Sequence, residues 1–338
     1  MKRLILICAV LVLVQTGLAV LTHVYKNSEV SRSAKGPLLK LAAAEVDELR
    51  LEDGEGRKLL LKKDKAQWQL PDLASFPADS VRVQGLIDRL AGLQRGWPEA
   101  TTAEAATRFK VATDRFERKL TLRKGGTDLG VLYFGSSPGL RKLYLRVDGD
   151  QEIMTLTMAP HDLEVGPDNW IDTHVLQLKP EQVVRVELPG VKLERGDEGL
   201  EPADLTAEEE VVKERRDALV KRITGLTISS VIGTENKPEY GLDFPVLRYT
   251  VELEGGERID YLFGRLPEPQ VSEPQGTLPE LPMPVLKVSG HDQLFRVEGW
   301  QMDELVRVDR VALVRPKVQP QAEAGQVAPP AVPTGPPQ

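Results

Sequence analysis

The stretch LIDRLAGL at residues 86–93 has a counterpart later in the chain, LVKRITGL at residues 219–226. In both stretches the apolar residues recur three and four positions apart, which is typical of the buried face of a helix. Pro77 and Asp79 precede the first stretch, and both residue types favour the start of a helix. We therefore predict an amphipathic helix at each place.

Four further pairs of short stretches match in the same order along the chain. Residues 38–41 match 175–178, residues 46–51 match 183–188, residues 132–135 match 261–264, and residues 144–149 match 285–290. The spacing along the chain between the two members is nearly the same in every pair, the helical pair included. Five matches in one order predict an internal duplication, with copies at residues 38–174 and 175–315.

The stretches around the predicted helices have the pattern of strands. Residues 46–51 place apolar residues at positions 46, 49 and 51, and residues 183–188 at 183, 186 and 188, an imperfect form of the alternation of half-buried strands. Turn dipeptides separate further strand-like runs in the first copy, namely Asp53-Gly54, Gly125-Gly126 and Asp148-Gly149. Consecutive strands joined by tight turns form antiparallel sheets. We predict an α+β fold in which each copy is an antiparallel sheet with the amphipathic helix packed on it.

The N-terminus carries an uncharged segment long enough to cross a bilayer. Lys2 and Arg3 precede residues 4–24, and a helix over that range spans ~31 Å. Because basic leader residues favour the cytoplasmic side, we predict an inner-membrane anchor at residues 1–24, a polar linker at residues 25–37, and an extracytoplasmic, periplasmic location for the rest. A removed signal peptide is the alternative, with Gly17-Leu18-Ala19 as its cleavage site.

Proline is concentrated in two other segments. Residues 316–338 hold seven prolines and few large apolar residues, a composition that predicts a disordered tail. Residues 266–284 hold six prolines and make this connection longer in the second copy than in the first. We hypothesise that this insert contacts a partner protein, and a passive surface loop is the alternative.

Composition and charge argue against several classes of function. The net charge of −7 gives no basic excess for binding nucleic acid. The single cysteine, Cys8, lies in the N-terminal apolar run, so the rest of the chain can form neither a disulfide nor a thiolate metal site. The histidines, at positions 23, 161, 174 and 291, lack the spacing of a helix-borne metal site. We expect no metal and no cofactor.

One motif has a catalytic interpretation. GSSPG at residues 135–139 fits the G-x-S-x-G pattern of a serine hydrolase, which would make Ser137 the nucleophile. That motif needs a helix after the serine, whereas residues 142–147 have the pattern of a strand, and Pro138 lacks a donor N–H. We predict that Ser137 lies in a turn and that the protein is not an enzyme. A serine hydrolase is the alternative.

Two other features have structural interpretations. Trp68 and Trp170 are predicted to pack in the core or at its edge, since no basic or aromatic stripe accompanies them. Residues 208–210 are three glutamates followed by basic residues at 213, 215 and 216, an order that complements a helix dipole. We therefore predict a solvated helix start at residues 208–210.

Several short motifs resemble the family called domain of unknown function 4340. The motifs are the strand at residues 46–51, Trp68-Gln69-Leu70, the helix at 86–93, Phe134-Gly135, Trp170-Ile171-Asp172, Tyr240-Gly241-Leu242 and Phe263-Gly264. The resemblance covers most of residues 38–314 and implies a membrane-anchored extracytoplasmic protein of the kind encoded beside ABC-transporter subunits of the gliding-motility auxiliary type. It implies no catalytic residue. The first copy departs from the family pattern with Phe109-Lys110-Val111 in place of Tyr-Gly-Leu.

These observations together predict a non-catalytic, single-pass scaffold or interaction protein. On the resemblance, its partners would be envelope or ABC-transporter proteins, with residues 4–24 in the membrane. A module that binds cell-wall polymer is a further hypothesis. It would need exposed aromatic side chains on one sheet face, which six tyrosines and four tryptophans in the whole chain barely supply.

Overall fold

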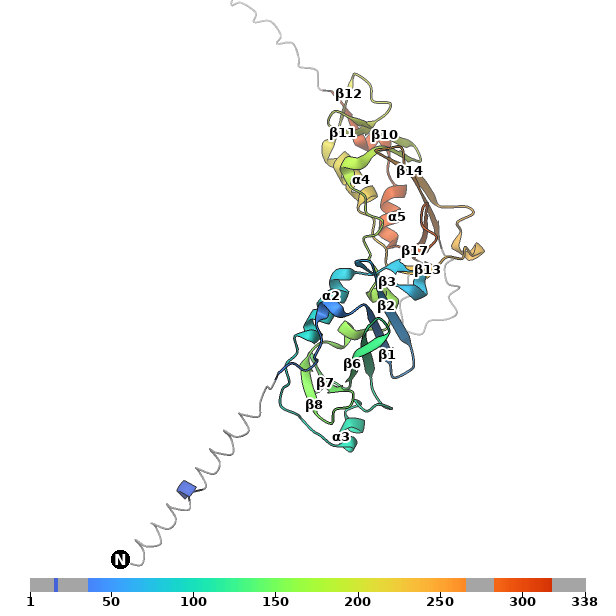
Figure 1. Cartoon of the computed structure of the whole chain (residues 1–338). Helices are drawn as coiled ribbons and strands as arrows, with labels where there is room; N and C mark the ends of the chain where they lie inside the picture. Colours follow the sequence, from blue (N-terminus) through green and yellow to red (C-terminus); the bar gives the residue numbers. More distant parts are fainter. Residues whose placement is uncertain (1–14, 18–35, 266–282, 318–338) are drawn as a thin grey trace, which may run out of the picture. The chain divides into compact units, whose positions relative to one another are not determined.

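The computed structural model of the chain describes residues 15–17, 36–265 and 283–317, and it is mixed α and β with antiparallel sheets dominating (Figure 1). The described residues divide into two compact units. Unit 1 holds those up to Val175 together with Ile228–Gly233, and unit 2 holds Leu176–Thr227 and those from Thr234 onward. Nearly all of the predicted anchor (1–24), linker (25–37) and insert (266–284) lies outside the described residues. None of the helices in the described ranges is long and apolar enough to span a bilayer.

Unit 1 contains an eight-stranded sheet with the order β4-β3-β2-β1-β5-β6-β7-β8, in which every neighbouring pair is antiparallel. Its main elements are β1 (Glu48–Asp53), β2 (Lys58–Asp64), β3 (Gln67–Leu70), β4 (Phe76–Pro77), α2 (Ser80–Ala91), α3 (Ala103–Arg108), β5 (Arg118–Lys124), β6 (Thr127–Phe134), β7 (Lys142–Val147) and β8 (Ile153–Thr157). The predicted turns at residues 53–54, 125–126 and 148–149 each lie in a connection between two hydrogen-bonded strands. The prediction of an antiparallel sheet is confirmed.

Helix α2 is the amphipathic helix that the sequence predicts at residues 86–93. It begins earlier, at Ser80, because the Asp79 carboxylate accepts hydrogen bonds from the backbone N–H groups of Val81 and Arg82, both at 3.0 Å. Its buried side chains recur three and four positions apart: Val83, Leu86, Ile87 and Leu90. This face packs against β3 and the 3-10 turn η1 (Ala43–Glu45). The remaining face of α2 carries exposed side chains such as Val81, together with Arg82 and Arg89, which contact His161 and Asp162.

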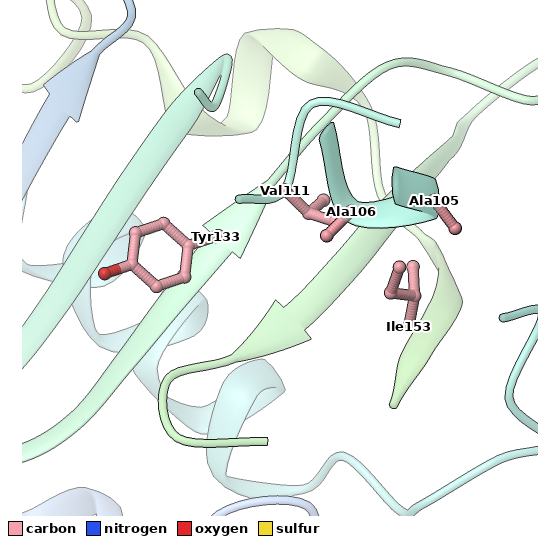
Figure 2. Close-up of a cluster of buried hydrophobic side chains, with 5 residues drawn as sticks. All are labelled: Ala105, Ala106, Val111, Tyr133 and Ile153. Carbon is pink, nitrogen blue, oxygen red and sulfur yellow. The ribbon is translucent and has the colours of Figure 1, made fainter. Parts of the chain in front are cut away.

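Helix α3 covers a second, smaller core at the far end of the sheet. Ala105 and Ala106 of α3 gather with Val111, Tyr133 of β6 and Ile153 of β8, as Figure 2 shows. The Arg146 guanidinium lies 4.7 Å from the Tyr133 ring centroid. Burial raises the pKa of the Tyr133 hydroxyl. Small alanines let this short helix approach the sheet closely.

Unit 2 contains a sheet whose strands follow the order β11-β10-β9-β14-β15-β16-β17. Its elements are β9 (Val183–Leu188), β10 (Val191–Gly196), β11 (Gly199–Pro202), β12 (Glu209–Val211), α4 (Lys213–Thr224), β14 (Leu247–Leu253), β15 (Arg258–Arg265), β16 (Pro284–Val288), β17 (Leu294–Arg296), α5 (Gly299–Val306), α6 (Arg310–Leu313) and β18 (Val314–Pro316). Strand β13 (Ser230–Gly233) belongs to unit 1. The predicted strand 183–188 is β9, and the second predicted helix is α4. Tyr249 and Tyr261 stack in the core with ring centroids 4.5 Å apart.

The prediction of a helix start at residues 208–210 is wrong. Glu209 and Glu210 belong to β12, which pairs with β18, and α4 begins only at Lys213. The cause is a distant partner: β12 pairs its backbone with β18, and the Arg310 guanidinium also donates to both carboxylate oxygens of Glu209, at 3.0 and 2.7 Å. Unit 2 also extends past the predicted limit of residue 315, since Pro316 is part of β18.

Both units contain the same close backbone contact. A Cβ built on Gly135, after β6, would lie 1.9 Å from the Phe109 carbonyl oxygen. One built on Gly264, in β15, would lie 1.9 Å from the Tyr240 carbonyl oxygen. Only glycine fits at either position, because the clashing atom belongs to the backbone. This explains the Phe-Gly dipeptide at residues 134–135 and 263–264.

Candidate interaction surface

The N-terminus of α2 is held between two buried tryptophans. The Ala78 N–H donates to the Trp68 carbonyl, and the Asp79 N–H donates to the Trp170 carbonyl, both at 2.8 Å. The backbone N–H of Trp68 donates to the Ser80 hydroxyl at 3.3 Å. Trp68 and Trp170 are 1% and 0% exposed, so the prediction that they are packing residues is confirmed. They fix where α2 starts and which of its faces points outward.

The outward face of α2 carries an apolar side chain and a gap. Val81 is 85% exposed, and Gly85, one turn later, has no atom within 4 Å of where a Cβ would stand. The φ of Gly85 is not positive, so its backbone conformation does not require glycine. In a helix interior glycine costs about 1 kcal/mol relative to alanine. The packing of the described residues of unit 1 therefore gives no reason for glycine at position 85.

A cavity lies on each side of this face, and both are lined by Val81 and Gly85. The larger, of about 510 Å³, has Trp68 in its wall, and the smaller, of about 280 Å³, has Trp170. A cation stands over each tryptophan: the Lys63 ammonium is 5.9 Å from the Trp68 ring centroid, and the Arg82 guanidinium is 5.0 Å from that of Trp170. We call these residues and cavities the α2 surface.

The charges of the α2 surface are only partly paired. Arg89 forms an ion pair with Asp162 at 2.8 Å, and Arg82 donates to the His161 carbonyl oxygen at 3.3 Å. Within the described part of the chain, neither Lys63 nor Arg82 forms an ion pair with a carboxylate. The surface thus offers an apolar centre beside Lys63 and Arg82, with Asp88 in the wall of the larger cavity and the Arg89–Asp162 pair in that of the smaller. That arrangement suits contact with an apolar, acidic segment of a protein.

Ser137 lies in the connection between β6 and β7. It is exposed, its hydroxyl donates to the Gly139 carbonyl oxygen at 2.6 Å, and the chain enters a strand at Lys142. The strand-then-helix context of a nucleophile elbow is not what surrounds this serine. The placement in a turn agrees with the prediction.

The histidines are dispersed. His161 lies 3.7 Å from Asp162 and His174 lies 3.8 Å from Asp172, whereas His23 is outside the described residues. Burial lowers the pKa of His291, and Lys287 adds to this shift. Over residues 36–265 and 283–317, no three His, Cys, Asp or Glu side chains are grouped to hold a metal ion.

A further cavity, of about 380 Å³, lies beside α3 and is lined in part by Arg146. Arg146 is 8% exposed, and its guanidinium donates to the carbonyl oxygens of Val111 at 2.7 Å and Asp150 at 3.1 Å, and to the Thr113 hydroxyl at 3.2 Å. These bonds join the loop after α3 to β7. Arg146 therefore has a structural role in holding this end of unit 1 together.

Comparison with known families matches residues 68–245 to the family described as "Domain of unknown function (DUF4340)". The match covers more than half of the 338 residues. The chain belongs to this family. No curated protein and no solved structure matches the chain.

The part of this DUF4340 chain that the family matches includes the whole helix α2, both flanking tryptophans, and α4. Of the motifs that carry the resemblance, the strand at 46–51 and Phe263-Gly264 lie outside it. Sequence reasoning missed the α2 surface itself. The available signal was Val81 and Gly85, which fall off the apolar face that Leu86 and Leu90 define.

Proposed function

We propose that the chain is a non-catalytic, membrane-anchored, extracytoplasmic interaction scaffold, and that it is an accessory component of an ABC-type transport system. The α2 surface carries the interaction part of this proposal. An 85%-exposed valine, a helical glycine that packs against none of the described residues, and two cations without a carboxylate partner among them are what a docking surface needs. The association with a transporter is supported by the family resemblance.

We further propose that the two units are copies of one ancestral fold. Seven strands follow one order in both sheets, from β3 to β8 and from β11 to β17. Helices α2 and α4 have equal lengths, and the alignment that pairs residues 86–93 with 219–226 also pairs their first residues, Ser80 and Lys213. The two glycine–carbonyl contacts, at Gly135 and Gly264, also support a common origin.

The anchor part of the proposal rests on the uncharged residues 4–24 after Lys2 and Arg3. It is tested by washing membranes with alkaline carbonate and sequencing the N-terminus of the retained protein. We expect the full-length chain in the pellet, with Met1 or Lys2 at its terminus. A mature protein that begins at Val20 would mean that the segment is a removed signal peptide.

The interaction part is tested with Val81→Asp in the full chain. An aspartate in the first turn of a helix is compatible with the helix dipole, so the fold should be kept. We expect at least a tenfold loss of the membrane proteins that co-purify with the chain. Val311→Asp is the matched control, since Val311 is also an exposed helical valine, 73% exposed, in unit 2. Equal recovery with both variants would refute the α2 surface as the docking surface.

A further inference from the structure

Helix α4 of unit 2 is the counterpart of α2. The elements that pack against α4 therefore indicate what could pack against the outward face of α2. When the two helices are aligned at their first residues, the α2 residues Val81, Arg82, Gly85, Leu86 and Arg89 correspond to Glu214, Arg215, Ala218, Leu219 and Arg222 of α4. The first set lines the smaller cavity of the α2 surface, and the second set lines a cavity of about 390 Å³ in unit 2. Corresponding helical positions thus border a cavity in both units.

The opposite wall of this cavity differs between the units. In unit 2 it is helical: α5 and α6 contact α4, and they bury Met302, Leu305 and Leu313. In unit 1 the corresponding wall includes His161 and Asp162, which belong to the short 3-10 turn η3 (Pro160–Leu163). Val81 remains 85% exposed beside that turn.

One ion pair occurs at the corresponding position in both units. Arg222 of α4 pairs with Glu304 of α5 at 2.7 Å, and Arg89 of α2 pairs with Asp162 at 2.8 Å. In unit 2, therefore, a helix supplies the carboxylate that meets the arginine on the outward face. Arg82 precedes Arg89 on this face as Arg215 precedes Arg222, and within the described ranges neither Arg82 nor Arg215 has a carboxylate partner.

We infer that the partner of the α2 surface is a helix of another polypeptide, which lies against α2 as α5 and α6 lie against α4. This inference rests on the proposed interaction function and names its partner. The partner helix presents small or apolar residues to Val81 and Gly85 and an aspartate or glutamate to Arg82. The missing side chain at Gly85 permits a close approach of the two helix axes, whose separation depends on the side chains at the crossing. The cation at Arg82 selects an acidic helix over a basic one.

The test places a photo-crosslinking amino acid at position 81 or 85 of the full chain in its native membrane. The crosslinked residues of the partner are identified by mass spectrometry. We expect both positions to react with one segment of a different protein, at residues three, four or seven apart, with an acidic residue within one turn. Attachment to lipid, to a second copy of this chain, or at residues two apart as in a strand would overturn the inference.

Charge is tested with Arg82→Glu, which we expect to lower the crosslinking yield from position 85 at least tenfold. Arg108→Glu is the matched control, because Arg108 is also a helical arginine of unit 1 that stands over an aromatic ring, 4.7 Å from the Phe109 centroid. Equal yields from the two variants would overturn the acidic character of the partner. If Val81→Asp leaves co-purification unchanged, the proposed function fails. If Val81→Asp reduces co-purification but the crosslinks lack helical spacing, the proposed function stands and only the inference that the partner is a helix is refuted.

Discussion

Replacing Gly135 by alanine should destabilise unit 1 far more than one methyl group ordinarily does. The new Cβ would lie 1.9 Å from the Phe109 carbonyl oxygen and 2.7 Å from that of Lys110. Real Cβ atoms essentially never come closer than 3.0 Å, so the backbone would have to move by about 1 Å or more. The Phe109 oxygen also accepts hydrogen bonds from the Ser136 N–H at 3.0 Å and the Ser136 hydroxyl at 3.3 Å, and this movement would weaken both.

Overpacking costs about 1–3 kcal/mol and a weakened hydrogen bond about 0.5–1.5 kcal/mol, so we expect a loss of about 2–4 kcal/mol. For a unit of this size that corresponds to a Tm lower by roughly 4–16 °C. The measurement is thermal and urea unfolding of the full chain followed by circular dichroism. Gly139→Ala is the control in the same connection, since nothing lies within 4 Å of its Cβ position, and it should change stability by less than about 0.5 kcal/mol.

Gly264→Ala should affect unit 2 to a similar extent, because the distance to the Tyr240 oxygen is the same 1.9 Å. A Gly135→Ala protein with the same Tm as Gly139→Ala would refute the reasoning. A large effect at Gly135 with none at Gly264 would show that the two contacts are not equivalent.

Three further changes have distinct expected outcomes. Lys110→Gly should stabilise unit 1 by about 0.5–1 kcal/mol in urea unfolding, because Lys110 has a left-handed φ of 58° that glycine adopts without strain; a loss of stability would contradict this. Hydrogen bonds from Arg310 lower the pKa of Glu209 to about 2 from 4.5, so the wild-type advantage over Glu209→Gln should be full above pH 4.5 and vanish as the pH falls towards 2; an advantage that stays constant over that range in pH-dependent unfolding would count against the ion pair. Ser137→Ala should leave the Tm and partner recovery unchanged, and labelling of the wild-type serine by a fluorophosphonate probe would favour the hydrolase alternative.

Local signals were sufficient for helices α2 and α4 and for strands β1, β7 and β9, whereas α3, α5 and α6 were not predicted. The spacing of Leu86 and Leu90 depends only on neighbouring residues, and so does the Asp79 cap, so α2 could be predicted from the sequence. The alternation over residues 183–188 likewise gave β9 its observed limits. Where a contact is non-local, the prediction failed: Glu209 is in a strand because β12 pairs with β18, which lies far along the chain.

The α2 surface shows a different limit of sequence reasoning. Val81 and Gly85 are ordinary residues in a helical segment. Only the folded structure shows that Val81 is exposed and that none of the described residues comes within 4 Å of a Cβ at Gly85. Their significance depends on exposure, which is a property of the assembled unit. The buried tryptophans that frame this surface could be predicted as packing residues, but the sequence did not indicate that they lie on either side of one helix.

The departure of unit 1 from the Tyr-Gly-Leu pattern, at Phe109-Lys110-Val111, changes the side chains and keeps the backbone conformation. Lys110 takes a φ of 58° where Gly241 takes 66°, and the carbonyl before each meets a glycine, Gly135 or Gly264. A left-handed lysine is strained, so the surrounding structure must hold it there. The contact that does so joins a carbonyl oxygen to a glycine, which makes it independent of side-chain chemistry. Because this contact involves backbone atoms, it does not restrict the side chains on the outward faces of α2 and α4, and these faces can differ in sequence. The exposed face of α2 is therefore available to the proposed partner.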